Sequence, residues 1–275
     1  MPPASEETLI AELGLRRERP WSLYDHPNLV RAASLLVFLT AWEIYGRRTD
    51  PILLTYPTAV ARAAFDLVLS GELPRQLLLS LLGLAAGFAA SVILGVGLGL
   101  VMGRSRVAEA ALDPHINALY ATPQVALTPL LIMWLGLGLA VKIVIIFLFA
   151  FFPILINTAS GVRNVSGPMV EVGRAYLASE RQILFKVIVP AALPFIMAGV
   201  RLAVGRALVG MIVGELFTAI TGLGHLLALY GNLFETARMF VVIIVLSLLG
   251  LGFSQATQTL ERRMARWKET ERAER

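Results

Sequence analysis

Charged side chains interrupt one long apolar stretch of the sequence, residues 191–220, at Arg201, Arg206 and Glu215. Ionisable groups at membrane depth are costly and usually face an opposite charge or a water-filled cavity. Arg206 and Glu215 are nine positions apart, too far along one helix for direct pairing. We therefore expect their partners to come from elsewhere, including a second copy of the chain. Arg201 is nearer one end of the stretch, where its side chain can extend to the membrane surface.

The sequence lacks the residues that disulfides, metal sites, nucleotide binding and catalysis need. The sequence has no cysteine, which excludes disulfides and thiolate metal sites. The three histidines, His26, His115 and His225, are far apart in the sequence and lack a partner at a metal-ligand spacing. None of the three lysines follows a glycine, so the nucleotide-binding motif Gly-x4-Gly-Lys-Ser/Thr is absent. We expect no catalytic residue, metal or cofactor in this chain. An intramembrane enzyme would need a nucleophile–base pair that the sequence does not offer.

The composition indicates lipid as the main solvent. Hydrophobic residues make up 57% of the 275 positions and charged residues only 16%, with a mean hydropathy of +0.72. A soluble domain carries about 25% charged residues. The basic residues flank apolar runs and form no continuous basic face, which argues against nucleic-acid binding. Residues 1–28 mix acidic, basic and proline residues, unlike a signal peptide, and are expected to form a cytoplasmic tail.

Six stretches are long enough to span a membrane, which takes roughly 20 apolar residues. They are residues 29–46, 77–103, 114–138, 140–161, 191–220 and 239–258. The fold class predicted is an all-α membrane protein with about six transmembrane helices. Lysine and arginine are retained on the cytoplasmic side. With the N-terminus inside, 16 of the 24 basic residues lie on that side and 6 on the other. Both termini are therefore predicted to be cytoplasmic.

Small residues recur at every fourth position of the second stretch. They are Gly83, Gly87, Ser91, Gly95, Gly99 and Gly103. Within a membrane, small residues let two helix backbones approach and so supply the packing between helices. We interpret these glycines as a helix-contact face and not as a ligand site.

Prolines and polar residues mark two stretches as candidates for the border of a translocation path. Pro123 follows Thr122 and interrupts the third stretch, because proline removes a backbone donor and clashes with the preceding turn. Irregular backbone at membrane depth is tolerated beside protein or a water-filled path. The candidate path residues are Pro123, Gln124, Asn157, Arg206 and Glu215. A kink that merely improves packing is an equally weighted interpretation of Pro123.

The segment 162–190 lies between two predicted spans on the positively charged side. It contains a run compatible with a helix, in which Glu171, Arg174, Glu180 and Lys186 alternate with apolar residues. A loop of this length with its own amphipathic helix is typical of a contact with another protein. The residues alone do not identify that protein.

In this segment the chain resembles the permeases of ABC importers that work with binding proteins, the type I family. Their cytoplasmic signature begins Glu-Ala-Ala, has a glycine six positions after the glutamate, and ends Ile-x-Leu-Pro. The sequence offers Glu171-Val172-Gly173, then Ala178-Ser179, then Val187-Ile188-Val189-Pro190 at matching distances. The segments 112–138, 151–163 and 199–217 are similar to the subfamily that imports sulfonates, taurine and nitrate. The resemblance covers roughly residues 70–260.

The resemblance implies a division of the chain and a set of partners. Residues 29–72 would form the first transmembrane helix and an extracytoplasmic segment, residues 73–260 the permease domain, and residues 261–275 a charged cytoplasmic tail. The chain would lie in the bacterial inner membrane as a homodimer, with an ATPase dimer that holds ATP and Mg and an extracytoplasmic substrate-binding protein. The implied ATPase-coupling residues are Glu171, Val172, Gly173, Arg174, Ala175, Leu177, Ala178, Ser179 and Pro190.

Glu171 is expected to anchor this coupling helix, with Ala175, Leu177 and Ala178 as its docking face. One departure concerns Leu177, which stands where the family has its signature glycine. Leucine adopts such a turn less easily, so the local geometry or the partner's groove is expected to differ. A secondary transporter or channel acting alone is the alternative, although no internal repeat supports it. Thiamine or riboflavin precursors remain alternative solutes to a sulfonate, taurine or nitrate.

Overall fold

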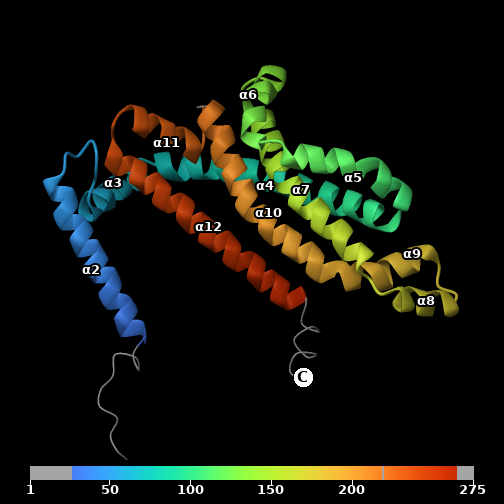
Figure 1. Ribbon diagram of the computed structural model, residues 1–275. Coiled ribbons are helices and arrows are strands. Elements are labelled where there is room, and N and C mark those ends of the chain that lie inside the picture. Colours follow the sequence, from blue (N-terminus) through green and yellow to red (C-terminus); the bar gives the residue numbers. More distant parts are fainter. Residues whose placement is uncertain (1–26, 219, 265–275) are drawn as a thin grey trace, which may run out of the picture. The chain divides into compact units, whose positions relative to one another are not determined.

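The computed structural model describes residues 27–218 and 220–264, all of whose regular elements are helices (Figure 1). Residues 1–26 of the expected N-terminal tail and 265–275 of the C-terminal tail lie outside the described residues. The chain divides into a unit that ends at Thr58 and a second unit that begins at Ala59.

In the first unit, helix α2 (Pro27–Arg48) corresponds to the first predicted span. Its last turns are tied to the segment that follows. The Trp42 indole donates a hydrogen bond to the Thr55 carbonyl oxygen at 2.8 Å, and the Glu43 carboxylate accepts from the Thr58 hydroxyl at 2.7 Å. Gly46 lies so close to Thr55 that a Cβ there would be 2.7 Å from the Thr55 carbonyl oxygen.

The second unit is built on three long helices that lie side by side (Figure 1). These are α4 (Glu72–Arg104), α7 (Leu139–Arg163) and α10 (Val189–Thr218). Around them lie α3 (Pro57–Leu69), α5 (Arg106–Ala121), α6 (Gln124–Leu135), α8 (Gly167–Ala175), α9 (Glu180–Ile183), α11 (Leu223–Asn232) and α12 (Thr236–Met264). Within the described residues, five helices are long and apolar enough to cross a membrane, or six if α5 and α6 count as one broken span.

Helix α4 packs on α7 along its line of small residues. A Cβ added at Gly87 would lie 2.8 Å from Ile146 Cβ, and one at Gly95 would lie 3.0 Å from Ile154 Cγ2. Gly99 and Gly103 meet α7 in the same way further along, whereas a Cβ at Gly83 would make ordinary contact at 3.7 Å with Leu139. Without side chains at these positions, the two backbones approach closely, and α4 and α10 together bury more than half of the residues of α7.

The third predicted span is two helices, α5 and α6, bent by 96°. The break is at Thr122 and Pro123, as the proline predicts. The Thr122 amide still closes the last turn of α5 through the Ala118 carbonyl at 3.1 Å, whereas Pro123 has no amide hydrogen to continue the helix. The sequence predicts the position of the break but not the size of the bend.

Candidate functional site

A helical hairpin joins the end of α7 to the start of α10, and it contains most of the predicted coupling residues (Figure 1). Its first helix is α8, with Pro168 in the first turn, where a missing amide hydrogen costs nothing. The helix ends when Leu177 adopts φ 57°, in the left-handed region. The Ala178 amide then donates back to the Gly173 carbonyl at 3.1 Å. The connection is therefore a tight left-handed helix end, the kind that glycine usually makes.

Leu177 thus makes the turn between the two short helices in a conformation that glycine adopts more easily. The expected difference from the family in geometry or in the partner's groove stays a prediction. A non-glycine residue in the left-handed region costs about 1–2 kcal/mol. The side chain does not recover this cost within the chain, because Leu177 is 93% exposed. Its neighbour Tyr176 is 84% exposed. Two large apolar side chains are thus presented outward at the tip of the hairpin.

The second helix of the hairpin, α9, starts with a reciprocal cap. The Ser179 hydroxyl accepts from the Gln182 amide at 3.3 Å, and the Gln182 side-chain oxygen accepts from the Ser179 amide at 2.8 Å. This capping box satisfies backbone donors that the helix start would leave free. Ser179 therefore has a clear local role in fixing where the hairpin turns back.

The predicted coupling residues divide into an outer and an inner set. Glu171, Val172, Arg174 and Ala175 are exposed on α8. Gly173 faces inward, where a Cβ would lie 3.3 Å from Ile183 Cγ1. Ala178 is partly buried against a cluster formed by Val162, Ile183, Ile188, Ala192 and Ile196. Leu177, Ser179 and Pro190 are exposed as well, so they belong to the outer set, which can reach a partner directly. The coupling role of both sets stays a prediction.

A π-helical turn, η2 (Leu184–Ile188), connects α9 to α10. Its Val189 amide donates to the Leu184 carbonyl, five residues back. Pro190 follows directly and has no amide hydrogen for the Lys186 carbonyl, so the regular ladder cannot continue there. An open groove of 470 Å³ lies beside this joint, lined by Met169, Val172, Lys186, Val187, Pro190 and Ala191.

Ion pairs connect the hairpin to the end of α4. Glu180 pairs with Arg104, the last residue of α4, and also lies 3.4 Å from Arg174 of α8. Nearby, Arg163 at the end of α7 pairs with Glu109 of α5 at 2.8 Å. The hairpin is therefore linked electrostatically to α4 as well as covalently to α7 and α10.

The predicted path residues do not form one cluster. Gln124, beside the bend, donates its amide to the Leu148 carbonyl at 3.3 Å. Asn157 donates to the Pro153 carbonyl at 2.8 Å, one turn back in α7. Arg206 lies on an exposed face of α10 and donates to the Tyr120 hydroxyl at 3.1 Å. The assignment of these residues and of Pro123 to a path stays a prediction.

Glu215 is buried, and its partners come from the same chain. The Ser80 hydroxyl donates to its carboxylate at 2.8 Å, and the Gly224 amide donates at 2.9 Å. Lys142 lies 3.8 Å away and donates to the Thr221 hydroxyl at 2.8 Å. The carboxylate therefore ties together α4, α7, α10 and the start of α11, at the end of this unit opposite the hairpin (Figure 1).

Glycines let the backbone approach this carboxylate. Gly222 has φ 102°, and a Cβ there would collide with the Glu215 side chain. The Gly222 amide donates to Gln76 at 2.7 Å, and the Leu223 amide donates to Ser80 at 2.8 Å. Sequence reasoning missed this network. The one local feature of the sequence that points to this network is the Gly-Leu-Gly at residues 222–224, which follows shortly after Glu215.

A separate hydrogen bond is made by Tyr230 of α11, which is not one of the long apolar helices. The Tyr230 hydroxyl donates to the Glu72 carboxylate at 3.0 Å. Burial, and then the hydrogen bond to Glu72, raises the pKa of Tyr230 to about 12. The phenol therefore keeps its proton and remains a donor that holds α11 to the first turn of α4.

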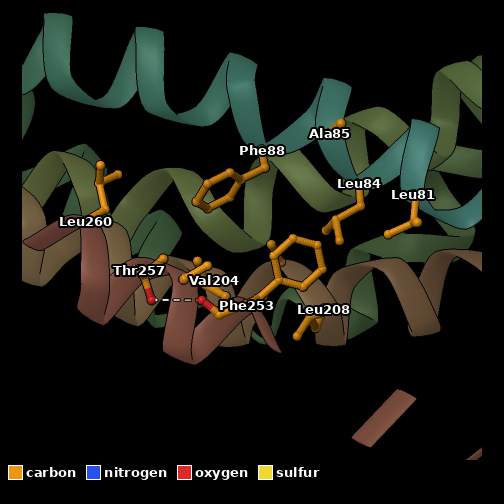
Figure 2. Close-up of a pocket in the computed structure, with 11 residues that line it drawn as sticks. Leu81, Leu84, Ala85, Phe88, Val204, Leu208, Phe253, Thr257 and Leu260 are labelled. Carbon is orange, nitrogen blue, oxygen red and sulfur yellow. Dashed lines mark hydrogen bonds between the residues drawn. The ribbon is translucent and has the colours of Figure 1, made fainter. Parts of the chain in front are cut away.

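An apolar cavity of 320 Å³ lies between α4, α10 and α12 (Figure 2). Figure 2 shows Phe88 of α4 and Phe253 of α12 lining it. Its one side-chain hydroxyl, that of Thr257, donates to the Phe253 carbonyl at 2.9 Å. The cavity thus offers hydrocarbon surface to an occupant and is unsuited to a charged solute.

Comparison with known proteins agrees with this arrangement. Residues 91–266 match the family described as binding-protein-dependent transport system inner membrane component. A protein of Bacillus subtilis (strain 168), named as the aliphatic sulfonates transport permease SsuC, is 34% identical over 84% of this chain and 85% of its own length. SsuC of Escherichia coli (strain K12) is 39% identical over 78% of this chain and 82% of its own length.

A solved structure shares the fold. A chain of the inward-facing MetNI methionine ABC transporter superposes with a TM-score of 0.54 at 20% identity, covering 68% of this chain and 93% of that chain. The relatives are permease subunits and not enzymes, and the apolar helices fit a multi-pass protein of the inner membrane. The chain belongs to the family of binding-protein-dependent ABC importer permeases.

Proposed function

We propose that this chain is the membrane-spanning subunit of an ATP-driven importer of small anions such as a sulfonate, taurine or nitrate. Two copies form the pathway, an extracytoplasmic binding protein delivers the solute, and an ATPase dimer holds ATP and Mg on the cytoplasmic side. Both termini and the α8–α9 hairpin lie in the cytoplasm. The sulfonate permeases of two bacteria support the choice of solute.

The observation that carries the proposal is the hairpin with its exposed tip. Tyr176 and Leu177 are apolar and almost fully exposed, and large exposed apolar side chains of this kind mark contacts with other proteins. The outer face of α8 adds Glu171 and Arg174, whose charges can set the orientation of a partner. These residues form the proposed docking surface for the ATPase.

The hairpin is also mechanically continuous with the membrane helices. Helix α9, η2 and α10 run without interruption from Glu180 to Thr218. A displacement of the hairpin by the closing ATPase dimer therefore moves the start of α10 directly. The pair of Arg104 and Glu180 adds a second connection, to α4. In the proposed mechanism, closure of the ATPase dimer moves the hairpin, and these two links pass the movement to α10 and α4, which border the path.

Reconstitution tests the proposal. The tagged permease is isolated with its bound ATPase, inserted into liposomes, and supplied with its binding protein and radiolabelled ethanesulfonate, taurine or nitrate. We expect uptake that requires both ATP and the binding protein. Riboflavin, an uncharged solute, serves as the comparison. Uptake by the permease alone, without an ATPase, would instead identify a transporter or channel that acts on its own. ATP-driven uptake of riboflavin and of no anion would contradict the choice of solute.

A further inference from the structure

An arginine lies midway along the exposed face of α10. Leu202, Val209 and Phe217 on this face are 60%, 49% and 50% exposed, and Arg206 lies among them. Arg206 is roughly 18 Å from the end of the helix at Thr218, given a rise of 1.5 Å per residue. A charge at this depth facing lipid tails would be strongly unfavourable. The face therefore borders a second protein surface or a water-filled path.

Tyr120 holds the guanidinium of Arg206 in place without neutralising it. The hydroxyl accepts a hydrogen bond from Arg206 at 3.1 Å, and the guanidinium carbon lies 5.2 Å from the centre of the Tyr120 ring. The tyrosine is itself positioned by Phe152 of α7, with the ring centres 5.9 Å apart. A cation over an aromatic ring gains about 0.5–2 kcal/mol, but the positive charge remains.

Other arginines of this unit show the contrast. Arg201, five residues earlier on α10, pairs with Glu261, and Arg104 and Arg163 also pair with glutamates. Among the described residues, no carboxylate lies within ion-pair distance of Arg206. An arginine with one side-chain hydrogen bond has donors left over, because the guanidinium carries five. Its chemistry is therefore that of an oxyanion receptor, which takes planar or tripodal oxygens through paired N–H donors.

The position beside the α5–α6 bend fits a path. Tyr120 is two residues before Thr122, where the helix breaks by 96°. Irregular backbone at membrane depth is tolerated where it lines a water-filled cavity. Tyr120 of α5 thus meets the exposed face of α10 beside the bend, and an anion at Arg206 would lie close to irregular backbone.

We propose that Arg206, oriented by Tyr120, is the intramembrane binding group for the sulfonate or other oxyanion group of the transported solute. The inference rests on the proposed function, because it takes the anion to be the cargo. It adds that the permease itself, and not only the binding protein, selects for negative charge. No bond is made or broken in this step, and the guanidinium keeps its proton throughout.

The first test measures ATP-driven uptake of ethanesulfonate, delivered at saturating concentration on its binding protein. We expect Arg206→Gln to lower the initial rate by about tenfold or more while ATP hydrolysis continues, because a charge-assisted contact is lost. Arg206→Lys keeps the charge without the fork of donors, so an intermediate rate is expected. Arg201→Gln, which removes the same charge from the same helix, should transport normally. Wild-type rates in Arg206→Gln would overturn the proposal and leave the proposed function intact.

A second measurement needs neither ATP nor binding protein. Sodium ethanesulfonate at fixed ionic strength should raise the thermal unfolding midpoint of the purified permease and of Arg201→Gln. The rise should be smaller for Arg206→Lys, which keeps a charged donor, and absent for Arg206→Gln. Such stabilisation without any ATP-driven uptake by the wild type would contradict the proposed function and keep the anion site. If Arg206→Gln and Arg206→Lys respond to ethanesulfonate as the wild type does, the anion site is disproved. Conversion of Arg206→Gln to a monomer with uptake retained would show that Arg206 meets a second copy of the chain instead.

Discussion

The Lys142 ammonium lies 3.8 Å from the Glu215 carboxylate, and their side chains are 5% and 2% exposed. This buried pair connects α7 to α10. The Lys142 ammonium donates hydrogen bonds to Thr221, at 2.5 Å to the carbonyl oxygen and 2.8 Å to the hydroxyl oxygen. The carboxylate accepts from Ser80 and from the Gly224 amide. Each charge is therefore stabilised by hydrogen bonds as well as by the other charge, as a buried pair requires.

Removing one charge of this pair should destabilise the permease strongly. Glu215→Gln keeps an acceptor for Ser80 but leaves the Lys142 charge uncompensated. Loss of one partner of a buried pair typically costs about 3–5 kcal/mol. We expect a clearly lower thermal unfolding midpoint for Glu215→Gln in detergent. The double variant Lys142→Met/Glu215→Gln should recover part of the loss, because no isolated charge remains.

The matched control for the buried pair is a pair that is partly exposed to solvent. Glu235 pairs with Arg238 at 2.8 Å, with side chains 39% and 43% exposed. A pair in contact with solvent contributes about 0–1 kcal/mol, so Glu235→Gln should leave the unfolding midpoint almost unchanged. Equal effects of Glu215→Gln and Glu235→Gln, or additive effects in the double variant at Lys142 and Glu215, would show that the buried charges do not interact.

Hydropathy predicts the membrane helices, but the sequence predicts the breaks and bends between helices only in part. Apolar runs of sufficient length predict α4, α7, α10 and α12, because backbone groups in lipid must be satisfied within a helix. Pro123 marks the break between α5 and α6 because it lacks an amide hydrogen. The 96° bend there depends on the packing of α6 on α7 and α10, which no local pattern contains.

The polar network at Glu215 could not be predicted from spacing. Ser80 and Glu215 are 135 positions apart in the sequence, and a serine in an apolar helix is equally compatible with bonding its own backbone, as Ser91 does with the Gly87 carbonyl at 2.7 Å. The left-handed conformation of Leu177 could not be predicted from the sequence either, because leucine rarely adopts it. A leucine disfavours φ 57°, and the hairpin imposes it through the Ala178 and Gly173 hydrogen bond.

Two substitutions at Leu177 separate backbone strain from side-chain docking. Leu177→Ala removes the exposed apolar side chain and keeps most of the left-handed cost. Leu177→Gly removes both the side chain and the cost of the left-handed conformation, which is about 1–2 kcal/mol. We expect both variants to bind the ATPase more weakly than the wild type, since burying a leucine is worth about 1.5–3 kcal/mol. The thermal midpoint of the isolated permease should rise only for Leu177→Gly.

The dissociation constant for the ATPase and the unfolding midpoint together decide this prediction. Unchanged ATPase affinity in both variants would show that Leu177 does not dock. A midpoint for Leu177→Gly no higher than that for Leu177→Ala would show that the left-handed residue carries no strain.

Reversing the charge of Glu171 should uncouple transport without affecting insertion. Glu171 is exposed on α8, so Glu171→Lys leaves the internal packing intact. A reversed charge at an interface costs several kcal/mol through like-charge contact and desolvation. We expect wild-type amounts in the membrane and no ATP-driven uptake. Asp66→Lys makes the same charge change at an exposed position of α3 and should transport normally. Normal uptake by Glu171→Lys would count heavily against the coupling role of the hairpin.

Neighbouring glycines of α4 provide a test of the helix contact with α7. A Cβ at Gly99 would lie 2.6 Å from Thr158 Cβ, whereas nothing lies within 4 Å of a Cβ at Gly97. Gly99→Ala therefore forces α4 and α7 apart, and overpacking of this kind costs about 1–3 kcal/mol. Gly97→Ala adds a methyl group in open space and should stabilise the helix by about 0.5–1 kcal/mol. The thermal unfolding midpoint should thus fall for Gly99→Ala and rise slightly for Gly97→Ala. Since both changes add the same methyl group to the same helix, equal shifts would mean that the close approach of α4 to α7 at Thr158 contributes nothing to stability.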